Sequence, residues 1–216
     1  GAIEAGQLGL IAPILVGPAA KIEEIAKSSK INLGKIDVVD APHSHAAAAK
    51  AVELVRSGKA ELLMKGSLHT DELMSEVVSH DTGLRTERRL SNAYIMDVPT
   101  YHKTLIITDA AINIYPGLDD KADICRNAID LAHILGIAMP KVAILSAVET
   151  VTSKIRSTLD AAALCKMAER GQITGALLDG PLAFDNAINK EAADIKGIKS
   201  EVAGDADAAM AALDEL

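Results

Sequence analysis

The sequence has very few aromatic residues and cysteines. With no Trp, one Phe and three Tyr, an aromatic core is excluded, and aliphatic side chains and alanine have to fill the interior. Two cysteines, Cys125 and Cys165, are too few for a disulfide framework. We interpret them as reduced, buried thiols, with a catalytic thiol as the alternative. No apolar run approaches the roughly 20 residues that span a bilayer, and no secretory signal pattern is present. We therefore expect a cytoplasmic protein without a membrane partner.

An excess of positive charge is also missing. The net charge is −8 and the pI is about 5.2, which argues against a nucleic-acid partner, because non-specific binding to phosphate backbones needs a basic face. A small anionic ligand stays possible, since a few Arg, Lys or backbone N–H groups suffice for it. Otherwise the balance of 49% hydrophobic and 24% charged residues over 216 residues is that of an ordinary globular protein.

Short apolar runs alternate with longer amphipathic segments. The runs predict strands over Pro13–Val16, Ile36–Val39, Glu61–Met64, Tyr94–Val98, Thr104–Thr108, Val142–Leu145 and Ile173–Leu178. The amphipathic segments predict helices over Ala19–Ser28, His45–Arg56, Thr70–Val78, Asp119–Leu135, Leu159–Arg170, Phe184–Ile195 and Ala206–Leu216. This order indicates an α/β fold with mixed, mostly parallel sheets covered by helices on both faces. The fourth and fifth strands leave no room for a helix between them, so we expect them to be antiparallel.

The turn Lys65–Asp71, KGSLHTD, follows one of these strands, and ligands of open parallel sheets bind beyond the carboxyl ends of strands. Gly66 lets the backbone approach an anion, Ser67 and Thr70 offer hydroxyl groups, and Lys65 adds positive charge. The following helix contributes N–H groups at its N-terminus. The turn therefore predicts a phosphate-binding site. The alternative is an ordinary turn in which Thr70 only caps a helix.

Arg85, Arg88 and Arg89 lie close together in the loop DTGLRTERRL. Guanidinium groups bind phosphate with two hydrogen bonds, which suits a phosphoryl or coenzyme A ligand. The alternative is a solvated basic loop whose charges pair with Asp81 and Glu87.

Polar residues follow two later strands. Asp109 and Asn113 come after Thr104–Thr108, and Ser146 comes after Val142–Leu145. All three are candidates for a cleft, and for Asp109 and Asn113 a turn or helix cap is the alternative. No HxxxH or paired His/Asp spacing supports a metal site. The absence of Gly-x-Ser-x-Gly and Gly-x-Gly-x-x-Gly argues against a serine hydrolase and a standard dinucleotide-binding site.

Seven blocks in order carry a resemblance to a known family. They are ILVGP (14–18), VVDAPHSHAAA (38–48), LLMKGSLHTDELM (62–74), ITDAAIN (107–113), NAIDLAHILGI (127–137), PKVAILSAVETV (140–151) and LDGPLAFDNAI (178–188). The chain resembles the phosphate acetyltransferase and phosphate butyryltransferase family, particularly the branch fused behind an enoyl-CoA-hydratase-like domain.

The resemblance implies a two-domain architecture like that of isocitrate and isopropylmalate dehydrogenases, with the active site in an interdomain cleft. We expect residues 1–115 to form the first domain, 116–205 the second, and 206–216 an unmatched terminal helix. The implied reaction is reversible transfer of an acetyl or butyryl group between coenzyme A and phosphate. Acyl-CoA and phosphate are then substrates, no cofactor is needed, and the protein forms a homodimer or larger homo-oligomer.

The resemblance also implies site residues. Ser67, His69 and Thr70 match the family's cleft turn, and Arg85 or Arg88 would contact phosphate or coenzyme A. Family members continue past a VAGDAD stretch with a terminal Ser-Arg motif and an acidic residue that bind phosphate and deprotonate the thiol. This sequence shows AAMAALDEL there, so we name no catalytic residue. Two alternatives remain: a metal- and NAD-dependent dehydrogenase of the same fold, and a shortened, non-catalytic member that acts as an interaction domain.

Overall fold

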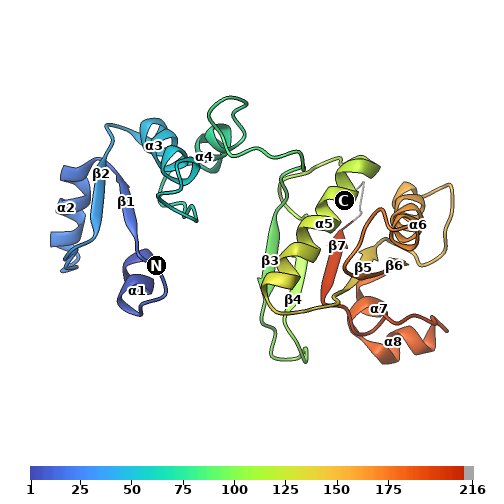
Figure 1. Ribbon diagram of the computed structural model, residues 1–216. Coiled ribbons are helices and arrows are strands. Elements are labelled where there is room, and N and C mark those ends of the chain that lie inside the picture. The colour runs from blue at the N-terminus through green and yellow to red at the C-terminus, as the bar shows by residue number, and fades with distance from the viewer. Residues whose placement is uncertain (212–216) are drawn as a thin grey trace. The chain divides into compact units, whose positions relative to one another are not determined.

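The computed structural model describes residues 1–211 and divides into two compact units (Figure 1). The N-terminal unit is Gly1–Glu87, and the C-terminal unit runs from Arg88 onward. This division lies upstream of the boundary expected between residues 115 and 116. The reason is that strand β4 (Leu105–Thr108) is hydrogen-bonded into the sheet of the C-terminal unit.

The N-terminal unit is a small α/β unit with a two-stranded sheet. Its elements are α1 (Ala2–Gln7), β1 (Ile14–Gly17), α2 (Ala19–Ser28), β2 (Asp37–Asp40), α3 (Ser44–Arg56) and α4 (Thr70–Val77). β1 and β2 are parallel, as predicted, with Leu15 opposite Val38. Among its described residues, the buried apolar side chains are Ala26, Ala41, Ala48 and Val52. The unit therefore has a small core that relies mainly on alanine.

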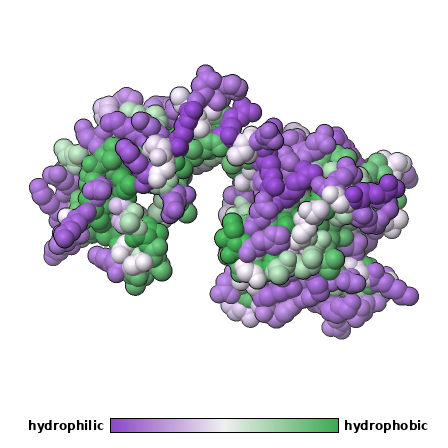
Figure 2. Space-filling view, viewed as in Figure 1, coloured by the Kyte–Doolittle hydropathy of each residue, from purple (hydrophilic) through white to green (hydrophobic). Residues whose placement is uncertain are grey.

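The predicted strand Glu61–Met64 is wrong, because this segment is irregular in the structure. Leu62 is 72% exposed and Met64 is 63% exposed. An apolar run becomes a strand only where a neighbouring strand takes up its backbone hydrogen bonds, and the two-stranded sheet of this unit consists of β1 and β2. Apolar surface is visible over the part of this unit that contains α1 and β1 (Figure 2).

The C-terminal unit contains a five-stranded sheet. Its elements are β3 (Ala93–Met96), β4, α5 (Leu118–Ile134), β5 (Lys141–Leu145), α6 (Arg156–Glu169), β6 (Leu177–Leu182), α7 (Phe184–Ile188), α8 (Lys190–Ile195) and β7 (Ala208–Ala211). The strand order is β3-β4-β7-β5-β6. β3 is antiparallel to β4, and the other pairs are parallel. The predicted mixed, mostly parallel sheet with an antiparallel pair is confirmed.

Helices cover both faces of this sheet, also as predicted. On one face, Val142, Ile144 and Met210 pack with buried residues of α5 and α6. On the other face, Ala143 and Leu182 pack with residues of α7, α8 and the segment that precedes β7. Neighbouring strand residues thus alternate between two cores, as the period of two in a strand requires.

The predicted helix over Ala206–Leu216 is wrong for its described part. Ala208–Ala211 is β7, and residues 212–216 lie outside the described residues. β7 lies in the centre of the sheet, where Ala208 is opposite Ile106 on one side and Val142 on the other. Alanine favours helices by well under 1 kcal/mol per residue, so pairing on both sides outweighs its local preference.

Two predicted elements are shifted or divided. The strand expected at Ile173–Leu178 is β6, which begins later and includes Gly180 and Pro181. Proline is compatible with a strand at the edge of a sheet, and an added Cβ at Gly180 would lie 2.5 Å from the Ile144 carbonyl oxygen. The helix expected at Phe184–Ile195 is two helices, because the Asn189 side chain accepts hydrogen bonds from the first N–H groups of α8.

Candidate functional site

The Lys65–Thr70 turn leads directly into α4 in the N-terminal unit. The Lys65 ammonium group folds back over the turn and donates to the carbonyl oxygen of Leu68 at 2.9 Å. Ser67 is exposed. His69 is the N-cap residue and Thr70 is the first helical residue, so the cap lies one position earlier than the sequence indicated. The exposed turn and the N-terminal N–H groups of α4 form a surface suited to an anion.

Glu72 ties this turn to the start of α3. Its Oε2 atom accepts from the backbone N–H of His69 at 3.1 Å. Its Oε1 atom accepts from the Ser44 hydroxyl at 2.8 Å and lies 3.3 Å from Nε2 of His45. The hydrogen bond from Ser44 is the main reason that the pKa of Glu72 lies below its ordinary value, although burial opposes it. Two sequence blocks, His43–Ala48 and Lys65–Met74, are thereby brought together.

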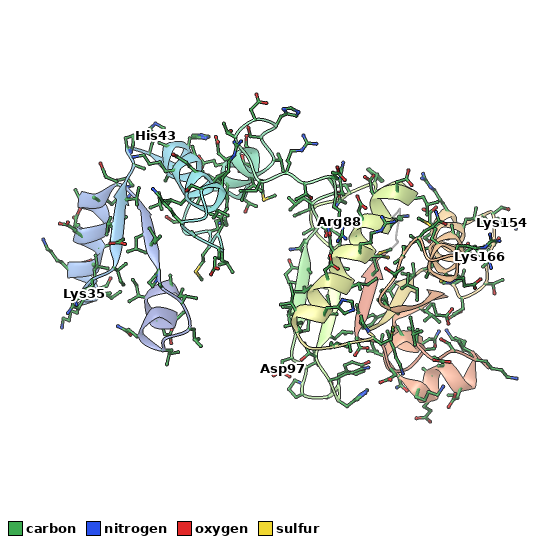
Figure 3. The ribbon with its side chains drawn as sticks, viewed as in Figure 1. Lys35, His43, Arg88, Asp97, Lys154 and Lys166 are labelled. Carbon is green, nitrogen blue, oxygen red and sulfur yellow. The ribbon has the colours of Figure 1, made fainter. Side chains whose placement is uncertain are left out.

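His43 and His45 both lie at the start of α3. His43 is the N-cap of α3, where its Nδ1 accepts from the backbone N–H of Ala46 at 3.2 Å. Figure 3 shows His43 at the start of this helix. His45 lies in the first turn. N-termini of two helices therefore lie close to Glu72.

The three arginines of the loop are held differently. Arg85 is exposed at the end of the N-terminal unit. Arg88 forms an ion pair with Asp130 of α5. Arg89, which the sequence-based site omitted, donates from Nε to Oδ1 of Asn113 at 2.8 Å. The loop is therefore only partly the solvated segment of the alternative interpretation, because Arg88 pairs with Asp130 and Nε of Arg89 lies 3.8 Å from Oδ1 of Asp120.

Asp109 organises the turn after β4. Its side chain is buried and accepts from the backbone N–H groups of Ala111 and Ile112, both at 3.0 Å, and from the Asn113 side chain. Burial raises the pKa of Asp109, but these hydrogen bonds outweigh it, and the pKa lies below its ordinary value. Asn113 in turn holds Arg89 and donates to the Leu90 carbonyl oxygen at 2.9 Å. Asp109 thus acts as a turn cap that fixes the arginine loop.

Ser146 lies at the carboxyl end of β5, at the same edge of the sheet as Asp109. Its hydroxyl is 2.7 Å from the Ser157 hydroxyl of α6, and both side chains are buried. Lys121 of α5 and Asp160 of α6 form a buried ion pair at 2.6 Å. Ser146 therefore fastens a helix to the sheet. Its partner Ser157 lies before the predicted helix start at Leu159, so the sequence pattern did not mark it as a contact residue.

A second polar cluster lies at the opposite edge, where β4, β5 and β7 begin. Asp205 accepts from Nζ of Lys141 at 2.6 Å and of Lys103 at 3.0 Å, and His102 Nε2 lies 2.9 Å away. Burial raises the pKa of Asp205, but these hydrogen bonds hold it well below its usual range. Asp207 accepts from Lys103 and from the backbone N–H of Lys141, both at 2.8 Å. This cluster fastens strands and lies away from the carboxyl edge where ligands bind.

The sequence-predicted residues thus fall into two groups. The N-terminal unit holds Lys65, Ser67, His69, Thr70 and Arg85, and the C-terminal unit holds Arg88, Asp109, Asn113 and Ser146. The structure brings the turn together with Glu72, and Asn113 together with Asp109. Sequence reasoning left Glu72 out, and it grouped Arg89 with Arg85 and Arg88 without assigning it to the site.

Comparison with known proteins decides the family. The family model described as "Phosphate acetyl/butaryl transferase" matches residues 43–210. The chain belongs to this family. It is 66% identical over 206 residues to a phosphate acetyltransferase of Rhizobium meliloti, covering 95% of this chain and 65% of that protein. It is 43% identical over 204 residues to a phosphate butyryltransferase of Clostridium acetobutylicum, covering 94% of this chain and 68% of that protein.

Solved structures agree with the fold of this phosphate acetyl/butyryl transferase family member. A branched-chain phosphotransacylase from Enterococcus faecalis V583 superposes with a TM-score of 0.75 at 26% identity, covering 93% of this chain and 79% of that one. The chain spans less than two thirds of the length of the first curated relatives, 65%, 59% and 60%. These comparisons do not favour the dehydrogenase alternative.

The thiols of this family member are poorly suited to act as nucleophiles. Burial raises the pKa of both Cys125 and Cys165 to about 12, and thiolates are the reactive form. Within residues 1–211, no group of three or more His, Cys, Asp and Glu side chains is placed to hold a metal ion. In that same part of the chain, no helix is both long and apolar enough to cross a membrane.

Proposed function

We propose that the protein transfers an acetyl or butyryl group reversibly between coenzyme A and inorganic phosphate. The observation that carries this proposal is the family match over residues 43–210, together with relatives named phosphate acetyltransferase and phosphate butyryltransferase at 66% and 43% identity.

The chemistry requires little from the protein beyond positioning and charge. The coenzyme A sulfur forms a bond with the carbonyl carbon of the acyl phosphate, the bond from that carbon to the phosphate oxygen breaks, and a base takes the thiol proton. Phosphate then leaves as an anion. Such a reaction needs a base, cations or N–H donors for phosphate, and a donor for the carbonyl oxygen. It needs no covalent protein nucleophile, which is consistent with the raised pKa values of Cys125 and Cys165.

Within this proposal, the Lys65–Thr70 turn and Arg85 bind phosphate or the phosphates of coenzyme A. Ser67 and Thr70 supply hydroxyl groups, and the N-terminus of α4 supplies N–H groups. From the C-terminal unit, Arg88 is a second candidate for phosphate. Asp109, Asn113 and Ser146 contribute by holding the carboxyl edge of the sheet in shape.

The proposed activity is accompanied by further proposals about architecture, assembly and location. We propose the two-domain architecture of isocitrate and isopropylmalate dehydrogenases with an interdomain cleft, no cofactor, a homodimer or larger assembly, and a cytoplasmic location. We also propose that the protein comes from the branch fused behind an enoyl-CoA-hydratase-like domain. Sedimentation velocity reports the assembly, and the intact mass of the natural protein reports the fusion. A sedimenting monomer, or a mass without room for an upstream domain, would contradict the respective statement.

The decisive experiment is an assay of the purified protein with acetyl-CoA and with butyryl-CoA in the presence of phosphate. Release of free coenzyme A thiol that depends on phosphate is the expected result. The absence of turnover with both substrates would reject the proposal and favour the non-catalytic alternative.

The turn is tested by Ser67→Ala. Losing one hydroxyl contact to an anion should raise the KM for phosphate about tenfold. Ser75→Ala is the matched control, because Ser75 is also exposed but lies further along α4. An equal response to phosphate in both variants would remove the turn from the site.

A further inference from the structure

Glu72 makes contacts that helix capping alone does not explain. A Glu at the third position of a helix commonly reaches back to the N–H of the cap residue, and Glu72 does so with His69. However, its other oxygen accepts from Ser44, a residue 28 positions earlier, and lies next to His45. The side chain is 15% exposed, so it is largely enclosed between α3 and α4.

The two oxygens of Glu72 hold three parts of the chain in a fixed arrangement. Ser44 and His45 belong to the first turn of α3, His69 ends the Lys65–Thr70 turn, and Glu72 itself belongs to α4. Hydrogen bonds to a charged group are stronger than those between neutral groups. The position of the His69 N–H, and with it the course of the preceding turn, therefore depends on a carboxylate that α3 also holds.

The charge of Glu72 would repel a phosphate if it were free. Its oxygens instead accept hydrogen bonds from the Ser44 hydroxyl and the His69 N–H, and Nε2 of His45 lies 3.3 Å from Oε1. The positive ends of α3 and α4 lie beside the same carboxylate. If the Glu72 carboxylate were removed, the turn would lose its attachment to α3, and no other group would take over the contacts of Glu72.

We infer that Glu72 is the positioning residue of the Lys65–Thr70 turn, which it locks to the start of α3 so that the turn is ordered for phosphate. This inference rests on the proposed function, in which that turn binds phosphate. Glu72 does not contact the reacting atoms. It acts through the turn.

The test compares Glu72→Ala with Asp71→Asn in the acyl transfer assay. Asp71 is exposed and lies in the same first turn of α4, so Asp71→Asn removes the same charge from the same helix end without the three contacts. We expect Glu72→Ala to raise the KM for phosphate about tenfold with kcat changed by less than about twofold. Asp71→Asn should leave both constants within about twofold of the original protein. Equal KM values in the two variants, or a fall in kcat alone, would overturn the inference.

Two further variants keep the test informative if Glu72→Ala folds poorly. Glu72→Gln keeps one oxygen and should raise the KM for phosphate about threefold. Ser44→Ala should raise it in the original protein and have no added effect in the Glu72→Gln background, because coupled residues are not additive. Full additivity of the two substitutions would show that Ser44 does not act through Glu72.

Amide hydrogen exchange gives a readout that does not require turnover. In Glu72→Ala, the amides of residues 66–69 should exchange faster than in Asp71→Asn, because the turn is no longer held. Unchanged exchange would overturn the inference. If the original protein showed no acyl transfer while these amides responded, the proposed function would be rejected and the positioning role of Glu72 would stand.

Discussion

The two units of this protein keep their polar residues in place by different means. In the C-terminal unit, Ser146 and Asp109 are buried and attached to a sheet with helices on both faces. In the N-terminal unit, the Lys65–Thr70 turn is exposed beside a two-stranded sheet, and it is held by polar contacts of Glu72. Binding residues can thus be ordered either by a core or by a carboxylate placed between helix ends.

The largest expected effect concerns the buried ion pair of the C-terminal unit. Lys121→Ala takes the buried partner from the Asp160 carboxylate, which keeps a longer contact of 3.7 Å with Arg156, and should cost about 3 kcal/mol in the free energy of unfolding. Urea unfolding followed by circular dichroism measures this. The control is Lys166→Ala in α6, since the Lys166–Glu169 pair is exposed, with 61% and 65% exposed side chains. That variant should lose less than about 1 kcal/mol. Equal losses would contradict a special role of the buried pair.

A Val-to-Ala truncation should cost more stability in the larger core of the C-terminal unit than in the small core of the N-terminal unit. Val142→Ala in β5 removes two methyl groups from a strand enclosed on both sides, and we expect a loss of about 2–3 kcal/mol. Val52→Ala in α3 makes the same change in the small unit, whose surroundings can collapse and where alanine favours the helix, so about 1 kcal/mol is expected. Both side chains are buried, at 0% and 2% exposure. Unfolding free energies in the reverse order would show that the N-terminal unit is the more tightly packed one.

The Asp205 cluster predicts an acid-sensitive C-terminal unit. Because the pKa of Asp205 is lowered in the folded protein, its carboxylate stabilises the fold above the ordinary Asp pKa of about 3.9. That contribution is lost as the pH falls from there through the folded-state pKa. Asp205→Asn should therefore flatten the fall of stability below about pH 4. Asp194→Asn is the control, because Asp194 forms an exposed pair with Lys190. An unchanged acid profile in Asp205→Asn would show that other carboxylates dominate.

The smallest expected effect is the difference in KM between variants of Arg85 and Arg88. Arg85 is exposed, and among the residues that the structure describes no hydrogen bond or ion pair holds its guanidinium group. Arg88 is engaged by Asp130. Arg85→Ala should therefore raise the KM for phosphate or coenzyme A about tenfold, and Arg88→Ala about threefold. Initial rates at varied substrate concentrations measure both. A larger effect of Arg88→Ala would transfer the phosphate contact to the C-terminal unit.

Much of the fold could be predicted from the sequence, because alternation of apolar runs and amphipathic segments is a local signal. The antiparallel pair β3–β4 followed from a connection too short for a helix. The errors lie in segments whose secondary structure depends on pairing with strands that are distant in the sequence. Glu61–Met64 has strand-like composition but is irregular, and Ala208–Ala211 has helix-like composition but forms a central strand. Neither outcome is encoded within the segment itself.

In the candidate site, too, local features could be predicted and features that depend on distant contacts could not. The Lys65–Thr70 turn was recognised from its residue types and its place before a helix. Glu72 could not be recognised in advance, because its contacts with Ser44 and His45 join residues 28 and 27 positions apart. Arg89 could not be separated from Arg85 and Arg88, since three nearby arginines differ only in the partners that the fold brings to them.

The central place of β7 has a consequence for how the protein is made. Among the residues that the structure describes, β4 and β5 do not pair with each other, and β7 joins the β3–β4 half of the sheet to the β5–β6 half. During synthesis on the ribosome, both halves must wait with an open inner edge until Ala208–Ala211 has been translated. Closure of such long-range pairs is slow. Nascent chains therefore pass through a stage in which two unpaired strand edges are available to chaperones or to other chains.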